Sequence, residues 1–354
     1  MEITIRKTTA PRVKPSDETG LGFGRSFTDH MFIMDYTDGK GWHDPRIVPY
    51  GPLALEPSTM TLHYGQTVFE GLKAYRTKGG DILLFRPEKN MERLNVSNER
   101  LCIPQIDVDF CVKALKTLVD TERDWVPSSE GTSLYLRPFI IATDPFLGVH
   151  PSHTYQFIVI CSPSGQYYPE GVNPVKIWVE SKYVRAVKGG VGYSKTAANY
   201  AASLKAQQEA EDAKYTQVLW LDGVERKYIE EVGTMNVFFV INGEVITPRL
   251  QGSILPGITR MSVIELLRAQ GRTVTERAIS IQEVYDAHTA GTLEEAFGTG
   301  TAAVISPIGE LNRDGEKIIL HGNTTGPVAR ALYNDLTGIQ SGEAADTFGW
   351  TQRV

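Results

Sequence analysis

The sequence has only three cysteines, no long apolar run and no block of basic residues, and each absence argues against a class of protein. Cys102, Cys111 and Cys161 are odd in number, far apart and in apolar surroundings, which favours buried thiols in a reducing compartment over disulfides. No stretch of about 18 apolar residues occurs, and the polar N-terminus has no apolar core of signal-peptide length. We therefore expect a cytoplasmic protein without a membrane partner.

Nucleic-acid, nucleotide and metal sites also lack sequence support. The 36 Lys and Arg residues are scattered and the net charge is −6, which disfavours a nucleic-acid partner. No GxSxG or GxxxxGK motif occurs, so the usual signals for a serine nucleophile and for a P-loop are missing. His150 and His153 in HPSH have no cysteine or acidic residue at a suitable spacing, and we expect no metal there. A small-molecule ligand is favoured.

The chain of 354 residues is long enough for two domains, each with its own core. The turn-rich stretch SPSGQYYPEGVNP, from Ser162 to Pro174, separates two strand-like runs and suits a connection between domains. We expect an N-terminal α/β domain over residues 1–167, a linker over 168–174 and a C-terminal α+β domain over 175–354.

Hydrophobic periodicity locates the main elements of these domains. It predicts helices over 89–101 and 110–125 in the first domain and over 199–213, 259–271 and 326–336 in the second. Short apolar runs at close spacing between residues 216 and 248 predict an antiparallel meander. The last stretch, SGEAADTFGWTQRV, is polar with two aromatics and is interpreted as a docked tail.

Lys195, in GGVGYSKTAANY, is the strongest candidate for chemistry. Three glycines precede it and small residues follow it, which leaves room for a bulky ring beside the ammonium. A lysine amine can form a Schiff base with an aldehyde cofactor such as pyridoxal phosphate. A glycine-rich turn that merely begins a helix is the alternative interpretation.

Glu231, in EVGTMN, is the candidate partner of that cofactor. The residues that follow it are apolar, and a carboxylate at the mouth of a buried strand needs a cation to offset its desolvation. A protonated pyridine nitrogen would serve. The alternative is that Glu230 and Glu231 form an exposed acidic pair.

Two loops could hold a phosphate. Pro256 and Gly257 directly precede a helical pattern, so the N–H groups of Ile258 and Thr259 would point at an anion. The glycine-rich GTGTAA, over residues 298–303, could form a backbone nest. Either loop could equally be a plain turn.

These motifs form a recognisable set. The chain contains, in the order found in branched-chain amino acid aminotransferases, HYGQTVFEGLKAYR, NMERL, YLRP, LGV, GGVGYSKTAANY, EVGTMN, ILPGITR and FGTGTAA. It resembles a full-length member from about Gly22 to about Gly309. The resemblance implies the fold-type-IV pyridoxal-phosphate architecture, with two α/β domains, a cofactor between them and a homodimer.

The resemblance also assigns roles to residues at the cofactor. Lys195 would be the Schiff-base lysine and proton shuttle, Glu231 the partner of the pyridine nitrogen, and Tyr200 the partner of the phenolic oxygen. The phosphate ligands it implies are Arg93, Leu255, Ile258, Thr259 and Thr301.

For the substrate, the resemblance implies an apolar pocket with a cationic group for a second carboxylate. Arg137 is the candidate cation, and Leu147 and Val149 would reach across the dimer interface. The other implied substrate residues are Phe23, Tyr64, Phe69, Tyr135, Tyr167, Thr234, Thr301 and Ala302.

The implied reaction is reversible transfer of the amino group of L-leucine, L-isoleucine or L-valine to 2-oxoglutarate, giving branched-chain 2-oxo acids and L-glutamate. A D-amino-acid aminotransferase or an aminodeoxychorismate lyase of the same fold is the alternative, and a binding protein without activity is a third. The sequence does not rank the three amino acids.

Overall fold

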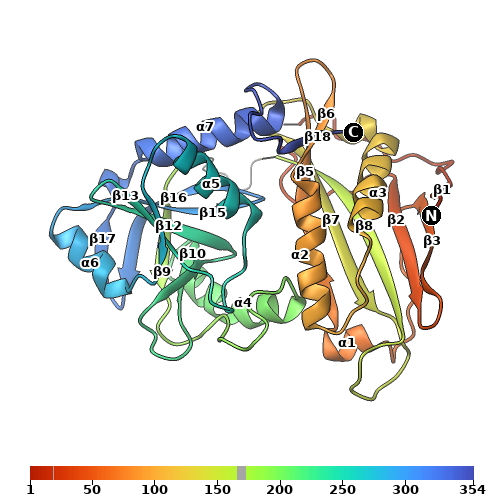
Figure 1. Cartoon of the computed structure of the whole chain (residues 1–354), viewed down its shortest axis with the longest axis horizontal. Helices are drawn as coiled ribbons and strands as arrows, with labels where there is room; N and C mark the ends of the chain where they lie inside the picture. The colour runs from red at the N-terminus through yellow and green to blue at the C-terminus, as the bar shows by residue number, and fades with distance from the viewer. Residues whose placement is uncertain (19, 166–172) are drawn as a thin grey trace. The chain divides into compact units, whose positions relative to one another are not determined.

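A computed structural model describes residues 1–18, 20–165 and 173–354, and the chain divides into two compact units (Figure 1). The first comprises Met1–Tyr167, Ser194–Ala197 and Gly338–Val354, and the second Tyr168–Tyr193 and Ala198–Thr337. Ser194–Ala197 thus belongs by its contacts to the first unit, although it follows the expected linker in the sequence. Tyr167 and most of that linker lie outside the described residues.

A nine-stranded sheet forms the frame of the first unit, in the order β1-β3-β2-β8-β7-β5-β6-β18, with β4 also paired to β7. All pairings are antiparallel except that of β1 with β3. The strands are β1 Thr4–Ile5, β2 His30–Thr37, β3 Gly41–Pro49, β4 Thr67–Phe69, β5 Leu72–Arg76, β6 Ile82–Phe85, β7 Ser133–Ala142, β8 Thr154–Ser164 and β18 Thr351–Arg353.

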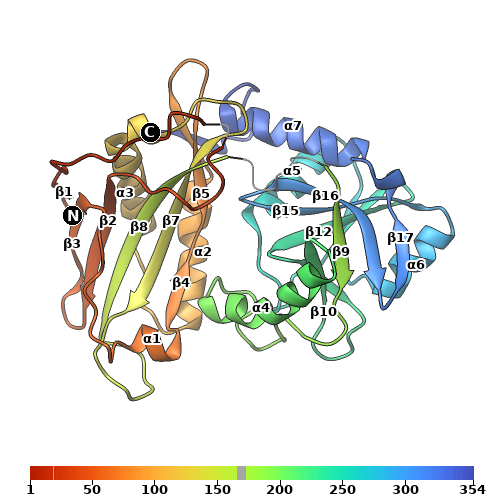
Figure 2. The same cartoon turned by 180° about the vertical axis from the view of Figure 1, so that it is seen from behind.

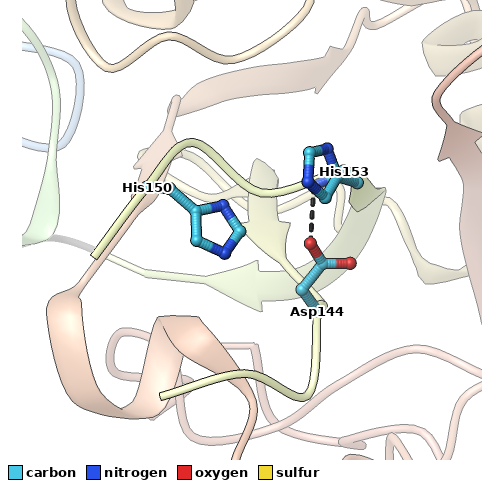
Figure 3. A group of neighbouring side chains, drawn as sticks. All are labelled: Asp144, His150 and His153. Carbon is cyan, nitrogen blue, oxygen red and sulfur yellow. Dashed lines mark hydrogen bonds between the residues drawn. The ribbon is translucent and has the colours of Figure 1, made fainter. Parts of the chain in front are cut away.

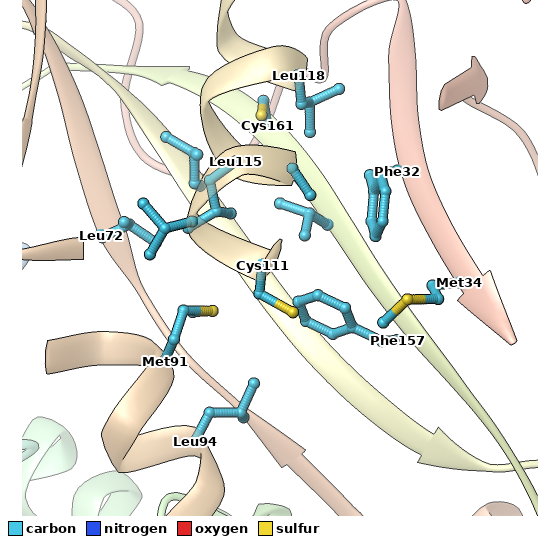
Figure 4. Packing of buried hydrophobic residues seen from close by; sticks show 14 of the residues in the cluster. Phe32, Met34, Leu72, Met91, Leu94, Cys111, Leu115, Leu118, Phe157 and Cys161 are labelled. Atoms are coloured by element: carbon cyan, nitrogen blue, oxygen red, sulfur yellow. The ribbon is translucent and has the colours of Figure 1, made fainter. Parts of the chain in front are cut away.

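Helices α2 (Pro87–Arg100) and α3 (Val108–Thr121) lie side by side on one face of this sheet (Figure 1). Their apolar stripes pack on Leu72, Leu134 and Leu136, and Figure 4 shows the centre of this core. Because strand side chains alternate between faces, Tyr135 and Arg137 point to the opposite face. The smaller helices α1 (Met60–Tyr64) and η1 (Arg123–Trp125) complete the unit.

The opposite face has a smaller apolar cluster of its own. Met31, Ile33 and Ile158 from the strands pack there with Tyr50 and Leu53 from the segment after β3. In the view from behind, N-terminal segments of the chain run over this face (Figure 2). The candidate residues of β7, Tyr135 and Arg137, therefore lie on the face turned away from α2 and α3.

The C-terminal stretch is a docked tail, which confirms that expectation. Its strand β18 pairs antiparallel with β6, and the Arg86 N–H donates to the Trp350 carbonyl at 2.7 Å. Trp350 meets the Phe85 ring of β6 edge-on, with ring centroids 5.7 Å apart. Aromatic packing and backbone pairing thus hold the end of the chain in place.

The second unit also contains a nine-stranded sheet, in the order β11-β10-β9-β16-β15-β12-β13-β14, with β17 paired to β16. The successive pairings from β10 to β13 are antiparallel, which confirms the predicted meander. The strands are β9 Val175–Val179, β10 Gln217–Leu221, β11 Ile229–Val232, β12 Met235–Ile241, β13 Glu244–Pro248, β14 Val274–Arg277, β15 Leu293–Gly300, β16 Val304–Arg313 and β17 Glu316–Ile319.

The predicted helices of this half are present as α4 (Ala197–Asp212), α5 (Ile258–Ala269) and α7 (Pro327–Ser341). The first turn of α7 is capped from a distant strand, because the Glu295 carboxylate accepts the N–H groups of Val328 and Ala329 at 2.9 and 3.0 Å. The sequence interpretation missed α6 (Ile281–Thr289), whose Ser280 accepts the Glu283 N–H. A 3-10 turn, η2 (His321–Asn323), precedes α7.

Two expectations from composition can be compared with the structure. Cys111 and Cys161 are buried, as expected, but Cys102 is exposed, so its apolar neighbours in sequence were misleading. Among the described residues, no helix is both long and apolar enough to cross a membrane.

Candidate active site

The backbone around Lys195 is fixed from both sides by the first unit. The Lys195 N–H donates to Ser97 Oγ at 2.9 Å, and its carbonyl accepts the Phe69 N–H at 3.0 Å. Thr196 forms an antiparallel bridge with Val68 and donates its hydroxyl to the Thr67 carbonyl at 2.7 Å. Lys195 is therefore held against β4 and α2, and its side chain is half-buried.

Lys195 and Arg137 share an aromatic neighbour. The Lys195 Nζ lies 4.9 Å from the centre of the Phe69 ring, and the Arg137 guanidinium carbon lies 4.8 Å from the same centre. Arg137 Nη2 donates to the Tyr135 hydroxyl at 2.9 Å, and Phe23 meets the Tyr135 ring edge-on at 4.8 Å. The structure thus brings together the Lys195 amine, the Arg137 guanidinium and three of the aromatic rings that the resemblance implies for one pocket.

Gly71 is required for this cluster. A Cβ at Gly71 would overlap the Tyr135 hydroxyl. Any larger residue would displace Tyr135, and with it the hydroxyl that receives the Arg137 hydrogen bond.

Arg93 is held by a carboxylate that the sequence interpretation missed. Arg93 Nε and Nη2 donate to the two oxygens of Glu70 at 2.8 Å each, and Asn90 donates to Glu70 at 2.8 Å. Burial would raise the pKa of Glu70, but the charge and hydrogen bonds of Arg93, then the charge of Lys195 and the Asn90 amide, hold that pKa below its ordinary value. Glu70 therefore remains ionised and orients the Arg93 fork.

Lys73 is a second lysine on the face that carries Tyr135. It lies opposite Tyr135 in the register of β5 and β7, and it is buried. Burial lowers the pKa of Lys73 to about 8. Part of its amine would be neutral near neutral pH, so it is the natural rival of Lys195 as a nucleophile.

Tyr64 and Leu147 form a second group in the first unit. The Tyr64 hydroxyl donates to the Leu147 carbonyl, which fixes the middle of the loop between β7 and β8. The side chains of Leu147 and Val149 are 63% and 83% exposed. This loop presents apolar groups to the outside of the chain.

Glu231 is buried in β11 of the second unit, and so is Glu230, which excludes the alternative of an exposed acidic pair. The cation beside Glu231 is Arg185, whose Nη2 lies 2.9 Å from Glu231 Oε1. The same Nη2 donates to the carbonyls of Gly192 and Ser253 at 3.1 and 2.7 Å. The buried carboxylate thus has a cationic partner, as expected. The sequence did not identify Arg185 as that partner, because 46 residues separate it from Glu231.

Glu231 also connects to the expected phosphate loop. Its Oε1 accepts the Leu255 N–H at 2.7 Å, and the Leu255 carbonyl accepts Asn236 Nδ2 at 2.9 Å. Helix α5 then begins at Ile258, and no side chain within the described residues caps it. The second unit therefore links Glu231 by a hydrogen bond to Leu255, and Leu255 lies three residues before the start of α5 at Ile258 and Thr259.

The remaining candidates of the second unit are placed by their element and their burial. Tyr200 is half-buried in α4, and Thr301 and Ala302 are half-buried in the turn between β15 and β16. Beside this turn, the hydroxyls of Thr299 and Ser306 are buried without a hydrogen-bond partner among the described residues. Thr234, in the turn between β11 and β12, is exposed.

An acidic residue lies beside the histidines of HPSH, contrary to the prediction from their spacing in the sequence. Asp144, six residues before His150, lies beside both histidines. The chain reverses direction between β7 and β8, and this reversal brings the carboxylate to the imidazoles.

Comparison with known proteins identifies the family of this chain. Residues 67–311 match the family described as amino-transferase class IV. Branched-chain-amino-acid aminotransferase 2 of Bacillus subtilis is 62% identical over 352 residues, which cover 99% of this chain and 97% of the relative. The chain belongs to the amino-transferase class IV family and, within it, to the branched-chain-amino-acid aminotransferases.

Solved structures show the same fold. The branched-chain amino acid aminotransferase of Escherichia coli has a TM-score of 0.77 and 28% identity, covering 92% of this chain and 98% of that one. The branched-chain aminotransferase of the archaeon Thermoproteus uzoniensis, solved with norvaline, has a TM-score of 0.76 and 26% identity, with coverage of 92% and 99%. The predicted two-domain fold-type-IV architecture is thereby confirmed.

Proposed function

We propose that this chain transfers the amino group of L-leucine, L-isoleucine or L-valine to 2-oxoglutarate, with pyridoxal 5'-phosphate as its cofactor. The observation that carries this proposal is the placement of Lys195 and Arg137 against one ring, Phe69. A transaminase needs an amine at the reacting carbon and a cation for a substrate carboxylate. The 62% identity with the Bacillus subtilis enzyme supports the choice of substrate.

The residues present suit the cofactor. Arg93 is a guanidinium fork fixed by Glu70, and α5 begins without a side-chain cap, so both could meet a phosphate. We assign the phosphate to Arg93, Leu255, Ile258, Thr259 and Thr301. Bound pyridoxal phosphate supplies an electron sink that acidifies the Cα–H of an amino acid.

Glu231 and Tyr200 would set the electronic state of the ring. We assign Glu231 to the pyridine nitrogen, where an ionised carboxylate favours the protonated form. Arg185 Nη2 lies 2.9 Å from that carboxylate and orients it. We assign the phenolic oxygen to Tyr200.

Lys195 would be both the covalent anchor of the cofactor and the proton shuttle. Its Nζ removes the proton from the substrate Cα and returns it in the reverse half-reaction. Ser97 and Phe69 fix its backbone, so the amine moves only by rotation within its own side chain.

Substrate selection would combine aromatic walls with one guanidinium. Phe23, Phe69 and Tyr135 offer an apolar surface, on which each buried methylene is worth about 0.8 kcal/mol. Arg137 would receive the second carboxylate of glutamate. The other residues that we assign to the substrate are Tyr64, Leu147, Val149, Tyr167, Thr234, Thr301 and Ala302.

A homodimer in the cytoplasm is the assembly we favour. The exposed apolar side chains of Phe146, Leu147 and Val149 would be covered by a second copy. The cytoplasm suits Cys111 and Cys161, because burial raises the pKa of both thiols and keeps them protonated.

A panel of amino donors tests the activity. L-leucine, D-alanine and aminodeoxychorismate are each incubated with 2-oxoglutarate, and glutamate is measured, with pyruvate measured for the third. We expect glutamate from L-leucine alone. Glutamate from D-alanine, or pyruvate from aminodeoxychorismate, would instead support one of the alternative activities.

Replacing Lys195 by Ala should lower glutamate formation from L-leucine by more than about 10³-fold, because the proton shuttle is lost. Lys188→Ala is the matched control, since Lys188 is exposed and lies seven residues earlier. Equal rates in the two variants would contradict the role of Lys195.

A further inference from the structure

We propose that Asp144, His150 and His153 form a binding site for one divalent transition-metal ion of the zinc type. These residues occupy the loop between β7 and β8 (Figure 3). One candidate ligand atom from each lies within 4.8 Å of the other two. The site shares no residue with the groups assigned to the cofactor.

The His153 imidazole is already held as a metal-binding histidine usually is. Its Nδ1 lies 2.9 Å from Asp38 Oδ2. An ionised carboxylate can only accept, so the proton sits on Nδ1 and the lone pair of Nε2 is left for a ligand. A carboxylate behind a histidine fixes the ring and raises its basicity as a metal ligand.

His150 is oriented in the same way by a different acceptor. Its Nδ1 lies 2.7 Å from the Pro151 carbonyl, which can only accept, so Nε2 again carries the lone pair. The ring packs 4.8 Å from that of Phe146 and 5.2 Å from that of His153. With Nδ1 engaged in both rings, each imidazole can offer Nε2 to a metal ion.

The Asp144 carboxylate is fixed by the other side of the loop. Its Oδ2 accepts the His153 N–H at 2.7 Å (Figure 3). Its Oδ1 accepts the Thr154 hydroxyl at 2.8 Å. An ionised carboxylate has about four lone-pair positions, so these two bonds leave capacity for a cation. All three ligands are thus oriented before an ion arrives.

The donor set selects the kind of ion. Two imidazole nitrogens and one carboxylate oxygen suit zinc and its neighbours, whereas magnesium and calcium prefer oxygen ligands alone. Asp38 and Asp144 place two carboxylates beside the two imidazoles, which favours a dication. The side chains of His153 and Asp38 are 66% and 59% exposed, so water can fill the remaining coordination position.

An ion at this site would join the two ends of the loop. Asp144 lies at its start and His153 at its end, and between them Leu147 and Val149 are exposed. A metal that bridges these ends restricts the conformations of the segment between them. We therefore expect the ion to order the loop.

The test is calorimetric titration of the untagged, cofactor-loaded protein with zinc chloride after dialysis against a chelator. We expect one ion per chain and an affinity at least tenfold lower in each of Asp144→Asn, His150→Gln and His153→Gln. Asp38→Asn should lower the affinity by about 10-fold to 100-fold, because Asp38 orients His153 without touching the ion. His63→Gln is the control, since His63 also bonds a backbone carbonyl but belongs to no such cluster among the described residues.

Two outcomes would overturn the site. One is the absence of stoichiometric binding, and the other is binding that the three ligand variants leave at the affinity of His63→Gln. Amide hydrogen exchange gives a second measurement on the same samples. Zinc should slow exchange over residues 143–153 in the wild-type protein and in His63→Gln, and not in His150→Gln.

Discussion

Among the described residues, each unit contains a buried carboxylate–guanidinium pair, and the arginine and the carboxylate exchange roles between the two pairs. In the first unit Arg93 donates through two nitrogens to Glu70. In the second, Arg185 donates one bond to Glu231 and two more to backbone carbonyls. The group proposed to bind the cofactor is the arginine in the first pair and the carboxylate in the second.

This difference shows that a buried arginine–carboxylate pair can offer either its positive or its negative group to a ligand. Glu70 is fully buried and saturated by donors, so it can only hold Arg93 in place. Arg185 in turn is anchored by two backbone carbonyls, and Glu231 is the group that we propose to meet the cofactor. A cofactor with an anionic phosphate and a protonated ring needs one site of each kind.

Among substitutions in or beside these two ion pairs, Glu231→Gln should have the largest effect on turnover. Loss of the charge that keeps a ring nitrogen protonated should lower kcat for L-leucine by about 10²-fold, a magnitude typical of one electrostatic contact in an active site. Steady-state rates with saturating cofactor measure it. Glu225→Gln, an exposed change nearby in sequence, should have the wild-type rate, and a similar rate for Glu231→Gln would refute the assignment.

Glu70→Gln should act on cofactor binding more than on turnover. Without the carboxylate the Arg93 fork is no longer held, and the Kd for pyridoxal phosphate should rise about tenfold, or about 1.4 kcal/mol. Titration of the apoprotein followed by absorbance measures this Kd. Glu92→Gln, next to Arg93 but exposed, is the control. A Kd equal to that of the control would show that Glu70 does not position Arg93.

The pH dependence of stability should separate Glu70 from Glu230, whose pKa burial raises. The lowered pKa of Glu70 means that its stabilising contribution is complete above about pH 4.3 and is lost as the pH falls through the folded-state value. Glu230 should change the stability in the opposite direction. Because its folded-state pKa is raised, ionising it destabilises the fold as the pH rises above about 4.3. Urea unfolding from pH 3 to 7 of Glu70→Gln and Glu230→Gln, each against wild type, should give differences of opposite slope, and equal slopes would contradict both assignments.

The smallest effect should follow Gly71→Ala. The added methyl would push the Tyr135 hydroxyl away from Arg137 at a cost of about 1 kcal/mol, so KM for 2-oxoglutarate should rise about fivefold with little change in kcat. Gly51→Ala is the matched control, because nothing lies within 4 Å of a Cβ at that position. An unchanged KM in Gly71→Ala would remove Arg137 and Tyr135 from the recognition of the second carboxylate.

The sequence alone located the features that depend on local pattern. Periodicity predicted α2 to α5 and α7, and the glycines before Lys195 singled out that lysine. Helix α6 was also within reach, because Ser280 and Glu283 have the spacing of a capping box. Local signals of this kind depend on residues within one or two turns.

Other parts of the site could not be predicted because they depend on strand order. Glu70 meets Arg93 only because β5 leads into β6 and α2 returns over the sheet. Arg185 meets Glu231 through contacts that 46 residues separate. Asp144 reaches His150 across a chain reversal. No periodic pattern encodes such pairings, since they are fixed by register in the folded sheets.

The central claim, that Lys195 carries the cofactor, has a direct test that includes its rival. The cofactor-loaded protein is reduced with borohydride and digested, and the lysine that bears the phosphopyridoxyl group is identified by mass spectrometry. We predict modification of Lys195 alone, held by Ser97 and Phe69. Modification of Lys73, the buried lysine whose pKa is lowered to about 8, would contradict the account.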